Sequence, residues 1–446
     1  MTGIEIIHRL EKKGYDAYLV GGAVRDRLLG IESNDDDIVT SADPDQIECI
    51  FSNQKIKLVG KSFRVVMVDG IEVSSYRTDH YNGLSDKNVT VTPAKTLEED
   101  LTRRDLTINA MAMDSQGNLI DPHGGQHDLK IGLLRFVGDP KTRIWEDPNR
   151  IIRACRFRAT FPGSRFSLFT YYAMKEYAHY IKEYVDPERI RKEIMKAMKI
   201  KRASYFFEAL HEVEALIYIF PSLENCYMFP HGPHHGENVW VHNMVVGDYI
   251  KPQCPLLKLA AYLHDVGKPI SAHIKPETND FTFSDHNITG AKVAECELRK
   301  LTFSNSEIKY IKTIIREHML LCREDSTPKA VRKFLRRMRD KKIHYMDFIR
   351  LRIADRKGNY NLPDLTRAEI QHLIEVIESQ SVVEDKAFTL KLSGHDIMRE
   401  LELKPGRVIG FIKNQLEEMV LENPDLNDMD NLLEILRGGE IEYEHP

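Results

Sequence analysis

The chain has 446 residues, of which 42% are hydrophobic and 29% charged, and its formal net charge is −5. These values are typical of a globular protein with roughly two to four domains, and they exclude a strongly basic protein that coats nucleic acid. The start of the chain lacks a secretory leader, no apolar run is long enough to cross a membrane, and the six cysteines are scattered. We therefore expect a cytoplasmic protein with no membrane partner.

The predicted elements at the start of the chain mix helices with strands. Periodicity and turn residues predict a helix over 4–14, a strand over 16–20, and a glycine turn that opens a helix over 21–30. Further strands are predicted in four segments: 37–40, 55–60, 63–70 and 71–77. From about residue 140 onward the periodicity is helical almost throughout. We therefore predict an α+β fold, with a mixed head followed by all-helical domains.

The sequence NDDDIVT (34–40) places three acidic residues directly before an apolar strand. Because side chains alternate along a strand, Asp35 and Asp37 are predicted to point one way and Asp36 the other. Two carboxylates on one face repel each other unless a cation lies between them. A pair of divalent cations is the usual arrangement for phosphoryl displacement, and Mg²⁺ prefers carboxylates together with substrate phosphates. Metal ions and a nucleotide would therefore explain the crowding.

The residues around this acidic strand support a nucleotide site. Gly21 and Gly22 lie between a predicted strand and a predicted helix, where backbone N–H groups can approach an anion. Arg25 lies about one turn into that helix and is placed to reach a triphosphate. A third carboxylate is expected from Glu72, which opens a strand predicted to run beside the acidic one. Asp69 is the competing candidate.

Five segments, in this order, resemble the motifs of the class II tRNA nucleotidyltransferases, the family of CCA-adding enzymes and bacterial poly(A) polymerases. They are GGAVRDRLLG, DDDIVT, RRDLTINAMAMD (103–114), DPHGGQHDL (121–129) and EDPNRIIRACRFRATF (146–161). The resemblance implies a polymerase-β-like nucleotidyltransferase head followed by a helical neck, body and tail. It also implies two Mg²⁺ ions held by Asp35 and Asp37. Within RRDLTINAM it implies that Arg104 and Asp105 contact ribose and phosphates, supported by Asn109.

The segment 146–157 contains the residues predicted to select the base. Cytosine and adenine each present an amino donor beside a ring-nitrogen acceptor, whereas guanine and uracil present a carbonyl beside a ring N–H. Asp147 and Arg150 are predicted to share a helix face, where Asp147 would accept from the amino group and Arg150 would donate. A salt bridge between the two is the alternative, and the family pattern favours base recognition. Arg153, Arg156 and Arg158 continue the basic ridge as phosphate contacts or as ion pairs of the neck.

The segment 78–101 is predicted to be a long connection inside the head. In the resemblance it corresponds to the flexible loop that is needed when specificity changes from C to A. Its presence favours the addition of CCA, or of A alone, over the addition of CC.

A second set of residues with metal-binding chemistry lies between 231 and 358. His264 and Asp265 follow the apolar helix PLLKLAAYL and are predicted to be buried. An adjacent buried imidazole and carboxylate are costly unless they are paired or bind a metal. Lys268 is interpreted as a surface lysine, with phosphate contact as the alternative.

The ordered set of histidines and aspartates in this region resembles an HD-superfamily phosphohydrolase. The resemblance implies that His242, His264, Asp265 and Asp355 hold one divalent metal ion of unknown identity. It also implies that two further histidines add a second ion, namely His286 and His318. The implied chemistry is attack of a metal-activated water on a phosphoester, as in 2′,3′-cyclic phosphodiesterase, 2′-nucleotidase or phosphatase reactions.

The two resemblances together predict four domains and two activities. The domains are a nucleotidyltransferase head (1–138), a helical neck that binds RNA (139–225), an HD domain (226–360) and a helical tail that binds tRNA (361–446). The predicted reaction is the template-independent addition of CCA to tRNA with CTP and ATP, accompanied by phosphoester hydrolysis in the HD domain.

Three other functions are compatible with parts of the sequence. An A-adding enzyme or a poly(A) polymerase would share the head, but the complete HD cluster and the tail argue against it. A bifunctional alarmone synthetase–hydrolase would carry its HD domain first. A non-enzymatic RNA-binding module would not need the acidic pair and the HD cluster intact.

The segment KAVRKFLRRMRDKK (329–342) is rich in lysine and arginine. It is interpreted either as a solvated helix face or as a surface that follows phosphates.

Overall fold

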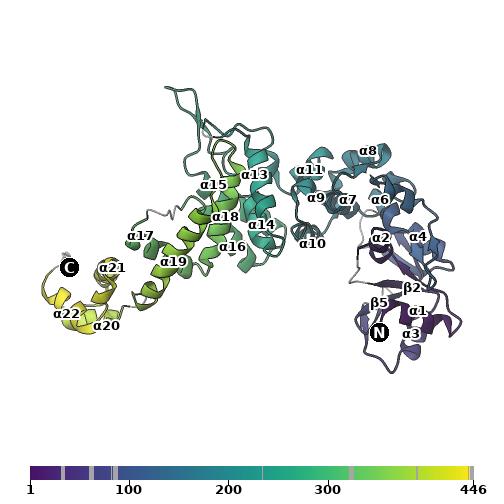
Figure 1. The fold of residues 1–446 in the computed structure, drawn as a ribbon, viewed down its shortest axis with the longest axis horizontal. Helices are drawn as coiled ribbons and strands as arrows, with labels where there is room; N and C mark the ends of the chain where they lie inside the picture. The colour runs from purple at the N-terminus through teal and green to yellow at the C-terminus, as the bar shows by residue number, and fades with distance from the viewer. Residues whose placement is uncertain are drawn as a thin grey trace. The chain divides into compact units, whose positions relative to one another are not determined.

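The computed structural model describes the following residues: 1–31, 36–59, 65–81, 83, 89–233, 235–320, 326–387, 390–439 and 441. The chain divides into two compact units (Figure 1). The first comprises Met1–Tyr227, Lys251–Leu256 and Glu295–Asn305, and the second comprises Met228–Ile250, Leu257–Ala294 and Ser306–Pro446. Within the described part of the chain, no helix is both long and apolar enough to cross a membrane.

The head contains a seven-stranded mixed sheet with the strand order β3-β4-β5-β2-β1-β8-β9. Its strands are β1 (Ala17–Val20), β2 (Asp37–Thr40), β3 (Ile56–Val59), β4 (Val65–Val68), β5 (Ile71–Ser75), β8 (Ala112–Met113) and β9 (Leu119–Ile120). Strands β2 and β5 run parallel, and the remaining neighbours are antiparallel. The predicted mixed sheet and the α+β class are therefore confirmed.

Apolar side chains cover both faces of this sheet. The helices of the head are α1 (Gly3–Glu11), α2 (Gly22–Leu28), α3 (Pro44–Ile50), α4 (Leu97–Thr102), the 3₁₀ turn η3 (Thr107–Asn109) and α5 (Gly125–Lys130). Leu19 and Ile38 pack with residues of α1 and α3, which Figure 1 shows beside β2 and β5. Their neighbours Val20 and Val39 pack on the other face with Leu101 of α4. The alternation follows from the two-residue period of a strand.

The segment predicted as a long connection contains regular structure. Strands β6 (Arg77–Tyr81) and β7 (Val89–Pro93) pair antiparallel, and α4 follows them. The interpretation of 78–101 as one long connecting loop was therefore wrong for its described residues. Thr90, Val91 and Thr92 are good strand formers, and each pairs with a residue of RTDHY in β6.

The neck is built from helices, with one pair of two-residue strands. Its elements are β10 (Leu133–Leu134), α6 (Pro140–Glu146), α7 (Asn149–Thr160), β11 (Arg165–Phe166), α8 (Leu168–Tyr177), α9 (Tyr180–Tyr184), α10 (Pro187–Ala197), α11 (Ser204–Glu212), η4 (Leu216–Tyr218) and α12 (Pro221–Glu224). Helix α7 packs against α10 and α11. Ile152, Cys155 and Ala159 of α7 are fully buried.

The remainder of the chain is helical apart from one short hairpin. Its elements are α13 (Val239–Tyr249), α14 (Pro255–Tyr262), β12 (His273–Ile274), β13 (Phe281–Thr282), α15 (His286–Lys300), α16 (Asn305–Glu317), α17 (Pro328–Asp340), α18 (Tyr345–Gly358), α19 (Arg367–Ala387), α20 (Gly394–Glu400), α21 (Arg407–Glu422), η5 (Pro424–Leu426) and α22 (Met429–Arg437). Helices α13 and α18 pack together. The last helices share a small core that includes Ile412, Leu416 and Leu432.

The basic segment forms α17, and several of its charges are paired with α21. Lys329 lies 2.7 Å from Glu422, Lys333 lies 2.5 Å from Glu418, and Arg336 pairs with Glu417. Arg332 is buried and donates to the backbone carbonyls of Leu421 and Glu422. These contacts favour a packing role for this face of α17 over a surface that follows phosphates.

Candidate functional sites

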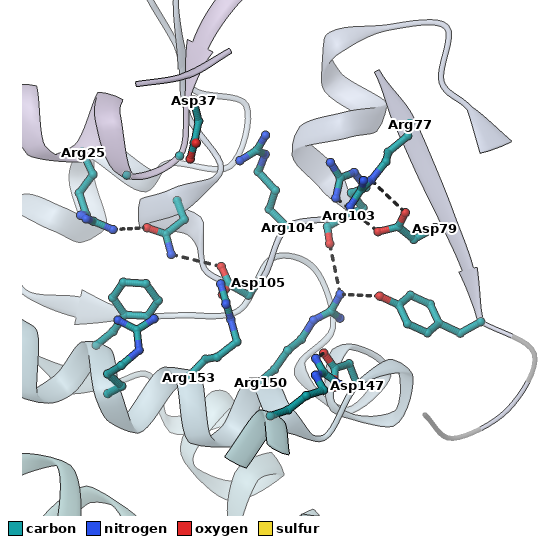
Figure 2. A pocket seen from close by; sticks show the side chains of 17 residues that line it. Arg25, Asp37, Arg77, Asp79, Arg103, Arg104, Asp105, Asp147, Arg150 and Arg153 are labelled. Carbon is teal, nitrogen blue, oxygen red and sulfur yellow. Dashed lines mark hydrogen bonds and ion pairs between the residues drawn. The ribbon is translucent and has the colours of Figure 1, made fainter. Parts of the chain in front are cut away.

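A cavity of about 490 Å³ lies in the first unit, lined by residues of the head and the neck (Figure 2). Eight arginines and four aspartates line it, so positive charge is in excess. Such a cavity suits a polyanionic ligand, because cationic walls concentrate anions.

Most of the residues predicted for the nucleotide site line this cavity. They are Gly21, Gly22, Arg25, Asp37, Arg104, Asp105, Asn109, Asp147, Arg150, Arg153 and Arg156. Asp35 lies outside the described residues. Glu72 is exposed and is not among the lining residues, although it lies next to one of them in the sheet.

Asp37 and Glu72 are adjacent because β2 and β5 pair in parallel with these two residues in register. Asp36 lies directly before β2, pairs with Arg27 at 3.4 Å and does not line the cavity. Asp69, the competitor of Glu72, lies in the turn between β4 and β5 and pairs with the chain's amino terminus at 3.2 Å. The geometry therefore brings Glu72, and not Asp69, next to the acidic strand.

The glycine turn brings the start of α2 close to the acidic strand. Gly21 has a φ of 65°, a left-handed conformation that glycine adopts without strain. A Cβ atom at this position would lie 3.1 Å from Nη1 of Arg104 and 3.9 Å from Oδ2 of Asp37. Only a residue without a side chain leaves this space for a ligand.

Arg25 lies in the cavity wall, but its guanidinium is already engaged. It donates to Oδ1 of Asn109 at 2.6 Å and to Asp26 at 2.9 Å, and lies 5.4 Å and 5.2 Å from the ring centroids of Phe157 and Phe161. Figure 2 shows its contact with the neighbouring amide. Arg25 thus connects α2 to the neck, and its reach to a triphosphate stays a prediction.

Asp105 is a buried carboxylate held by several donors. It accepts from Nε of Arg153 at 2.8 Å, from the backbone N–H of Leu106 at 2.7 Å and from Asn109 at 3.2 Å. Burial alone would raise the pKa of Asp105, but the charge of Arg153 and these hydrogen bonds outweigh it and hold the pKa below its usual value. Asp105 is therefore ionised and fixed in place at neutral pH.

Asp147 does not share a helix with Arg150, so the predicted common helix face was wrong. Helix α6 ends at Glu146 and α7 begins at Asn149, and Asp147 has an extended backbone between them with a φ of −152°. Pro148 accounts for the break, because proline disfavours helical conformation in the residue before it. Both residues nevertheless line the same cavity.

Each member of this pair has protein partners other than the salt bridge that was the alternative to base recognition. Asp147 accepts two hydrogen bonds from Arg189 of α10, at 3.0 Å and 2.7 Å. Arg150 donates to Glu146 at 2.5 Å and to the carbonyl of Arg143 at 2.8 Å, and contacts the hydroxyl of Tyr81 at 3.4 Å. The salt bridge between Asp147 and Arg150 that was the alternative to base recognition is therefore not formed.

The basic ridge of α7 combines ion pairs with cavity-lining positions. Arg156 donates to Glu193 of α10 at 2.5 Å, and Arg158 lies 3.5 Å from Glu212. Arg153 and Arg156 also line the cavity, whereas Arg158 does not. Ion pairing therefore accounts for Arg158. Arg153 and Arg156 both form ion pairs and line the cavity.

Six lining residues were missed by the sequence interpretation: Arg77, Asp79, Tyr81, Arg103, Phe157 and Arg189. The alternation of RTDHY, which puts Arg77, Asp79 and Tyr81 on one strand face, was a usable signal. No sequence signal pointed to Arg189, because it contacts Asp147 only through the packing of α10 on α7.

A second cluster lies in the second unit, where all six predicted HD residues come together. Nε2 of His242 lies 3.2 Å from Nε2 of His264 and 2.9 Å from Oδ1 of Asp355. Nε2 of His286 lies 3.2 Å from Nε2 of His318. Asp265 connects the two groups, with Oδ2 3.4 Å from His264 and Oδ1 3.3 Å from His286. The groups that include Asp265 are spaced to hold metal ions.

The charge state of the cluster also suits cations. Burial alone would raise the pKa of Asp265, but its interactions with His264 and with the ammonium of Lys268 outweigh burial and hold the pKa well below its usual value. The pKa of Asp355 is also held low, because hydrogen bonds from His242 and His264 outweigh its burial. Two ionised carboxylates and a set of imidazoles are a suitable ligand set for divalent metals.

Gly267 allows this cluster to assemble. A Cβ atom at Gly267 would lie 2.0 Å from the carbonyl oxygen of His286 and 2.6 Å from the N of Gly290. Any side chain would push α15 away from the loop that carries His264 and Asp265.

Four residues of this cluster were missed or misplaced by the sequence interpretation. His231, His235 and Glu237 form a further group beside His242. Lys268 is buried, not at the surface, and its ammonium lies 2.7 Å from Asp265. The interpretation of Lys268 as a surface lysine was therefore wrong. The cluster opens into a cavity of about 670 Å³ whose lining includes Lys268, Phe283 and Arg352.

Three family models match the chain. The Poly A polymerase head domain matches residues 17–135, the Probable RNA and SrmB-binding site of polymerase A matches 168–227, and the HD domain matches 245–374. The first and last of these matches each include part of the lining of one of the two cavities described above. Proteins with these two kinds of domain typically use divalent metals, in agreement with the ligand groups of the second cluster.

Curated relatives extend this similarity to the whole chain. A CCA-adding enzyme of Ligilactobacillus salivarius is 30% identical over 97% of this chain and 94% of its own length. A Multifunctional CCA protein of Legionella pneumophila is 34% identical over 68% of this chain and 74% of its own length.

Solved structures share the fold. The Bacillus stearothermophilus CCA-adding enzyme in complex with CTP has a TM-score of 0.70 and 23% identity, covering 98% of this chain and 96% of its own. The Thermotoga maritima CCA-adding enzyme complexed with tRNA has a TM-score of 0.53 and 18% identity, covering 98% and 94%. Both neighbours therefore share the fold of this chain over nearly its whole length.

Proposed function

Because the chain belongs to the family of CCA-adding enzymes, we propose that it adds C, C and A in turn to the 3′ end of tRNA, using CTP and ATP and no nucleic-acid template. The observation that supports this most is the arginine-rich cavity, in which Asp37 lies at one end and Asp147 and Arg150 at the other (Figure 2). Asp37 suits the reacting RNA end, the arginines suit a triphosphate, and Asp147 and Arg150 suit the edge of a base.

The reacting end of the site is proposed to bind two Mg²⁺ ions. Asp35 and Asp37 would hold them, and Glu72, in register with Asp37, would complete the acidic group. When bound, such ions lower the pKa of the attacking 3′-hydroxyl and neutralise the triphosphate, so that pyrophosphate can leave. The glycine turn at Gly21 leaves room for the phosphates beside Asp37.

Arginines and one carboxylate are proposed to orient the rest of the nucleotide. Arg104 projects toward the side of the cavity where Asp37 lies, as Figure 2 shows, and would bind a phosphate there. Asp105 would accept from a ribose hydroxyl, with Asn109 and Arg153 holding it in place. Arg153 and Arg156 add positive charge on the neck side.

The base is proposed to be selected by two fixed groups. Asp147 would accept from the amino group of C or A, and Arg150 would donate to the neighbouring acceptor. Arg189 and Glu146 hold these two side chains through charged hydrogen bonds, so neither needs to reorganise when a base arrives. Guanine and uracil would place a carbonyl against Asp147 and leave it without a donor.

A primer-extension assay tests this function. Transcribed tRNA that ends before CCA is incubated with CTP, with ATP, and with both. We expect growth by two nucleotides with CTP alone, by three with both, and then no further growth. Addition of A alone, or of A without limit, would support the alternative of an A-adding enzyme or a poly(A) polymerase.

The second cluster supports a further activity, a metal-dependent phosphohydrolase. The supporting observation is that six buried or partly buried residues, Asp265 among them, lie together beside an open cavity. The ligands would hold one ion through His242, His264, Asp265 and Asp355 and a second through His286 and His318. A bound ion supplies an activated water at neutral pH, and Lys268 lies where it can bind the phosphate. Hydrolysis of 2′,3′-cyclic AMP and 2′-AMP with Mg²⁺, Mn²⁺, Co²⁺ or Ni²⁺, against a chelator control, tests it.

The wider context follows from these two activities. The helical tail, with its own small core, is proposed to bind tRNA, and the four predicted domains remain the proposed organisation. Because its proposed substrate is cytoplasmic tRNA, the chain is proposed to act in the cytoplasm.

A further inference from the structure

Asp100 is a buried carboxylate of the head that has no part in the reaction proposed above. It lies in α4, four residues before Arg104, and its side chain is 0% exposed. It does not line the cavity, so any effect on a bound nucleotide must pass through other residues. A buried carboxylate is costly unless charged partners and hydrogen bonds compensate it, so its partners indicate its role.

Both oxygens of Asp100 accept hydrogen bonds from the two arginines of the RRD segment. Oδ1 accepts from Nε of Arg103 at 3.0 Å and from its Nη2 at 2.8 Å. Oδ2 accepts from Nη2 of Arg104 at 3.1 Å. Burial alone would raise the pKa of Asp100, but the charges of Arg104 and Arg103 and their hydrogen bonds outweigh burial and hold the pKa below its usual value. Asp100 is therefore ionised at neutral pH and holds two guanidinium groups at once.

The contact with Arg104 leads to the end of the cavity that is proposed to bind phosphates. Asp100 holds Nη2 of Arg104, whereas Nη1 lies near the glycine turn, where a Cβ atom on Gly21 would be 3.1 Å from it. In Figure 2 the guanidinium projects toward Asp37. A guanidinium that a carboxylate fixes on one side presents its remaining N–H groups to a phosphate without reorganisation.

The contact with Arg103 leads to the end of the cavity that is proposed to select the base. Nη1 of Arg103 donates to Oδ2 of Asp79 at 3.3 Å, so two carboxylates hold this side chain. The backbone carbonyl of Arg103 accepts from Nη2 of Arg150 at 3.2 Å, a contact that Figure 2 shows. The placement of Arg103 therefore contributes to the orientation of Arg150.

We infer that Asp100 is a positioning residue of the nucleotide site. It directs Arg104 at the phosphates, and it holds Arg103 where the Arg103 carbonyl orients Arg150. One buried charge thereby maintains both ends of the cavity, and this role rests on the proposed nucleotidyltransferase function. The alternative is a purely structural role, in which Asp100 only fastens α4 to β6 by accepting from the backbone N–H of Arg77 at 3.3 Å.

Nucleotide binding by the full chain tests the first end of the cavity. The wild type and its variants are titrated with CTP and Mg²⁺ by calorimetry, which measures affinity and the number of sites separately. We expect Asp100→Asn to weaken CTP binding by about 10- to 100-fold, because Arg104 loses a charged hydrogen bond that holds it. Asp100→Glu keeps the charge but displaces the carboxylate, so its affinity should be intermediate. Glu98→Gln is the control, because it removes the same charge from an exposed position of the same helix, and it should match the wild type.

Single-turnover extension of tRNA that ends before CCA tests the second end. Because the orientation of Arg150 depends on Arg103, Asp100→Asn should also lower the preference for CTP over UTP by about 3- to 10-fold. A purely structural role predicts a different result. Partial unfolding would reduce the number of CTP sites and the extension rate, but the folded molecules would keep the wild-type affinity and the wild-type preference.

The possible outcomes separate this inference from the proposed function. Wild-type affinity and preference in Asp100→Asn, whatever its number of sites, would refute the positioning role. If Asp100→Asn does not fold, the same two measurements on Asp100→Glu provide the test, and wild-type values there would refute the role. If the wild type binds CTP but extends no tRNA, the proposed function is wrong, and the CTP affinities of the variants still decide the role of Asp100. If the wild type binds no CTP, the proposed function and the inference are both refuted.

Discussion

Replacing Arg189 with methionine tests whether Asp147 recognises the base. Arg189 donates to both carboxylate oxygens of Asp147, at 3.0 Å and 2.7 Å, and only 12% of the Asp147 side chain is exposed. Methionine keeps the length and apolar contact of the side chain and removes both donors. Asp147 then loses two of the donors that hold its carboxylate and keeps the backbone N–H of Asn149, which donates to Oδ1 at 3.1 Å.

The size of the effect follows from the hydrogen bond that Asp147 would make to the base. A hydrogen bond to a charged group contributes about 1.5–3 kcal/mol. A carboxylate that is no longer held in one orientation still provides part of that energy. We therefore expect a loss of about 1–3 kcal/mol in transition-state binding of CTP and ATP, which is roughly a 5- to 150-fold fall in kcat/KM. UTP offers no amino donor to Asp147, so its incorporation should fall much less.

Single-turnover incorporation of CTP and UTP into tRNA that ends before CCA measures this. Lys192→Met is the matched control, because Lys192 lies on the same helix, is exposed and pairs with Glu188, away from Asp147. It should leave both rates unchanged. An equal fall for CTP and UTP in Arg189→Met, or no fall at all, would refute the assignment of Asp147 to the base edge.

Four further substitutions probe the two sites and the core. Asp37→Ala, like Asp35→Ala, should abolish extension in a radiolabelled tRNA assay while leaving tRNA binding in a gel-shift assay intact, because metal binding and not RNA contact is lost; weakened binding would contradict this. His264→Ala should remove phosphoester hydrolysis and leave CCA addition unchanged, and a parallel loss of extension would show that the two sites are not independent. Lys258 is fully buried and donates to the carbonyl of Ile250 at 3.0 Å, and burial, partly opposed by Asp248, lowers its pKa from 10.5 to about 8. The unfolded chain thus binds the Lys258 proton more tightly, so this group costs stability below pH 8, and that cost is relieved as the pH rises toward 10.5. Between pH 7.5 and 10 the wild type should gain roughly 2 kcal/mol of unfolding free energy relative to Lys258→Met in urea titrations, and identical pH dependence of the two proteins would contradict the burial argument.

The parts of the sites that could be predicted are those carried by short segments. The acidic strand, the glycine turn and the RRD segment each combine residue type with local spacing, and their residues line one cavity. The HD residues could be predicted because the ordered set resembles a known superfamily and because a buried His–Asp pair demands a ligand. In both cases the chemistry of a few neighbouring residues is sufficient to predict the site.

The parts that could not be predicted depend on packing between distant elements. The pairing of Asp147 with Arg189 requires α10 to lie against α7, and the pairing of α17 with α21 requires the tail to fold back on it. The break at Pro148 is a different case, because proline was a visible signal that the helix prediction should have used.

The most direct test of the account is a crystal structure of the chain with CTP and Mn²⁺, with the ions located by anomalous scattering. The account predicts ions bound by the carboxylates of Asp35 and Asp37 at the triphosphate, with the cytosine edge on Asp147 and Arg150. A triphosphate bound elsewhere, or residues 35 and 37 directed away from the ions, would contradict it.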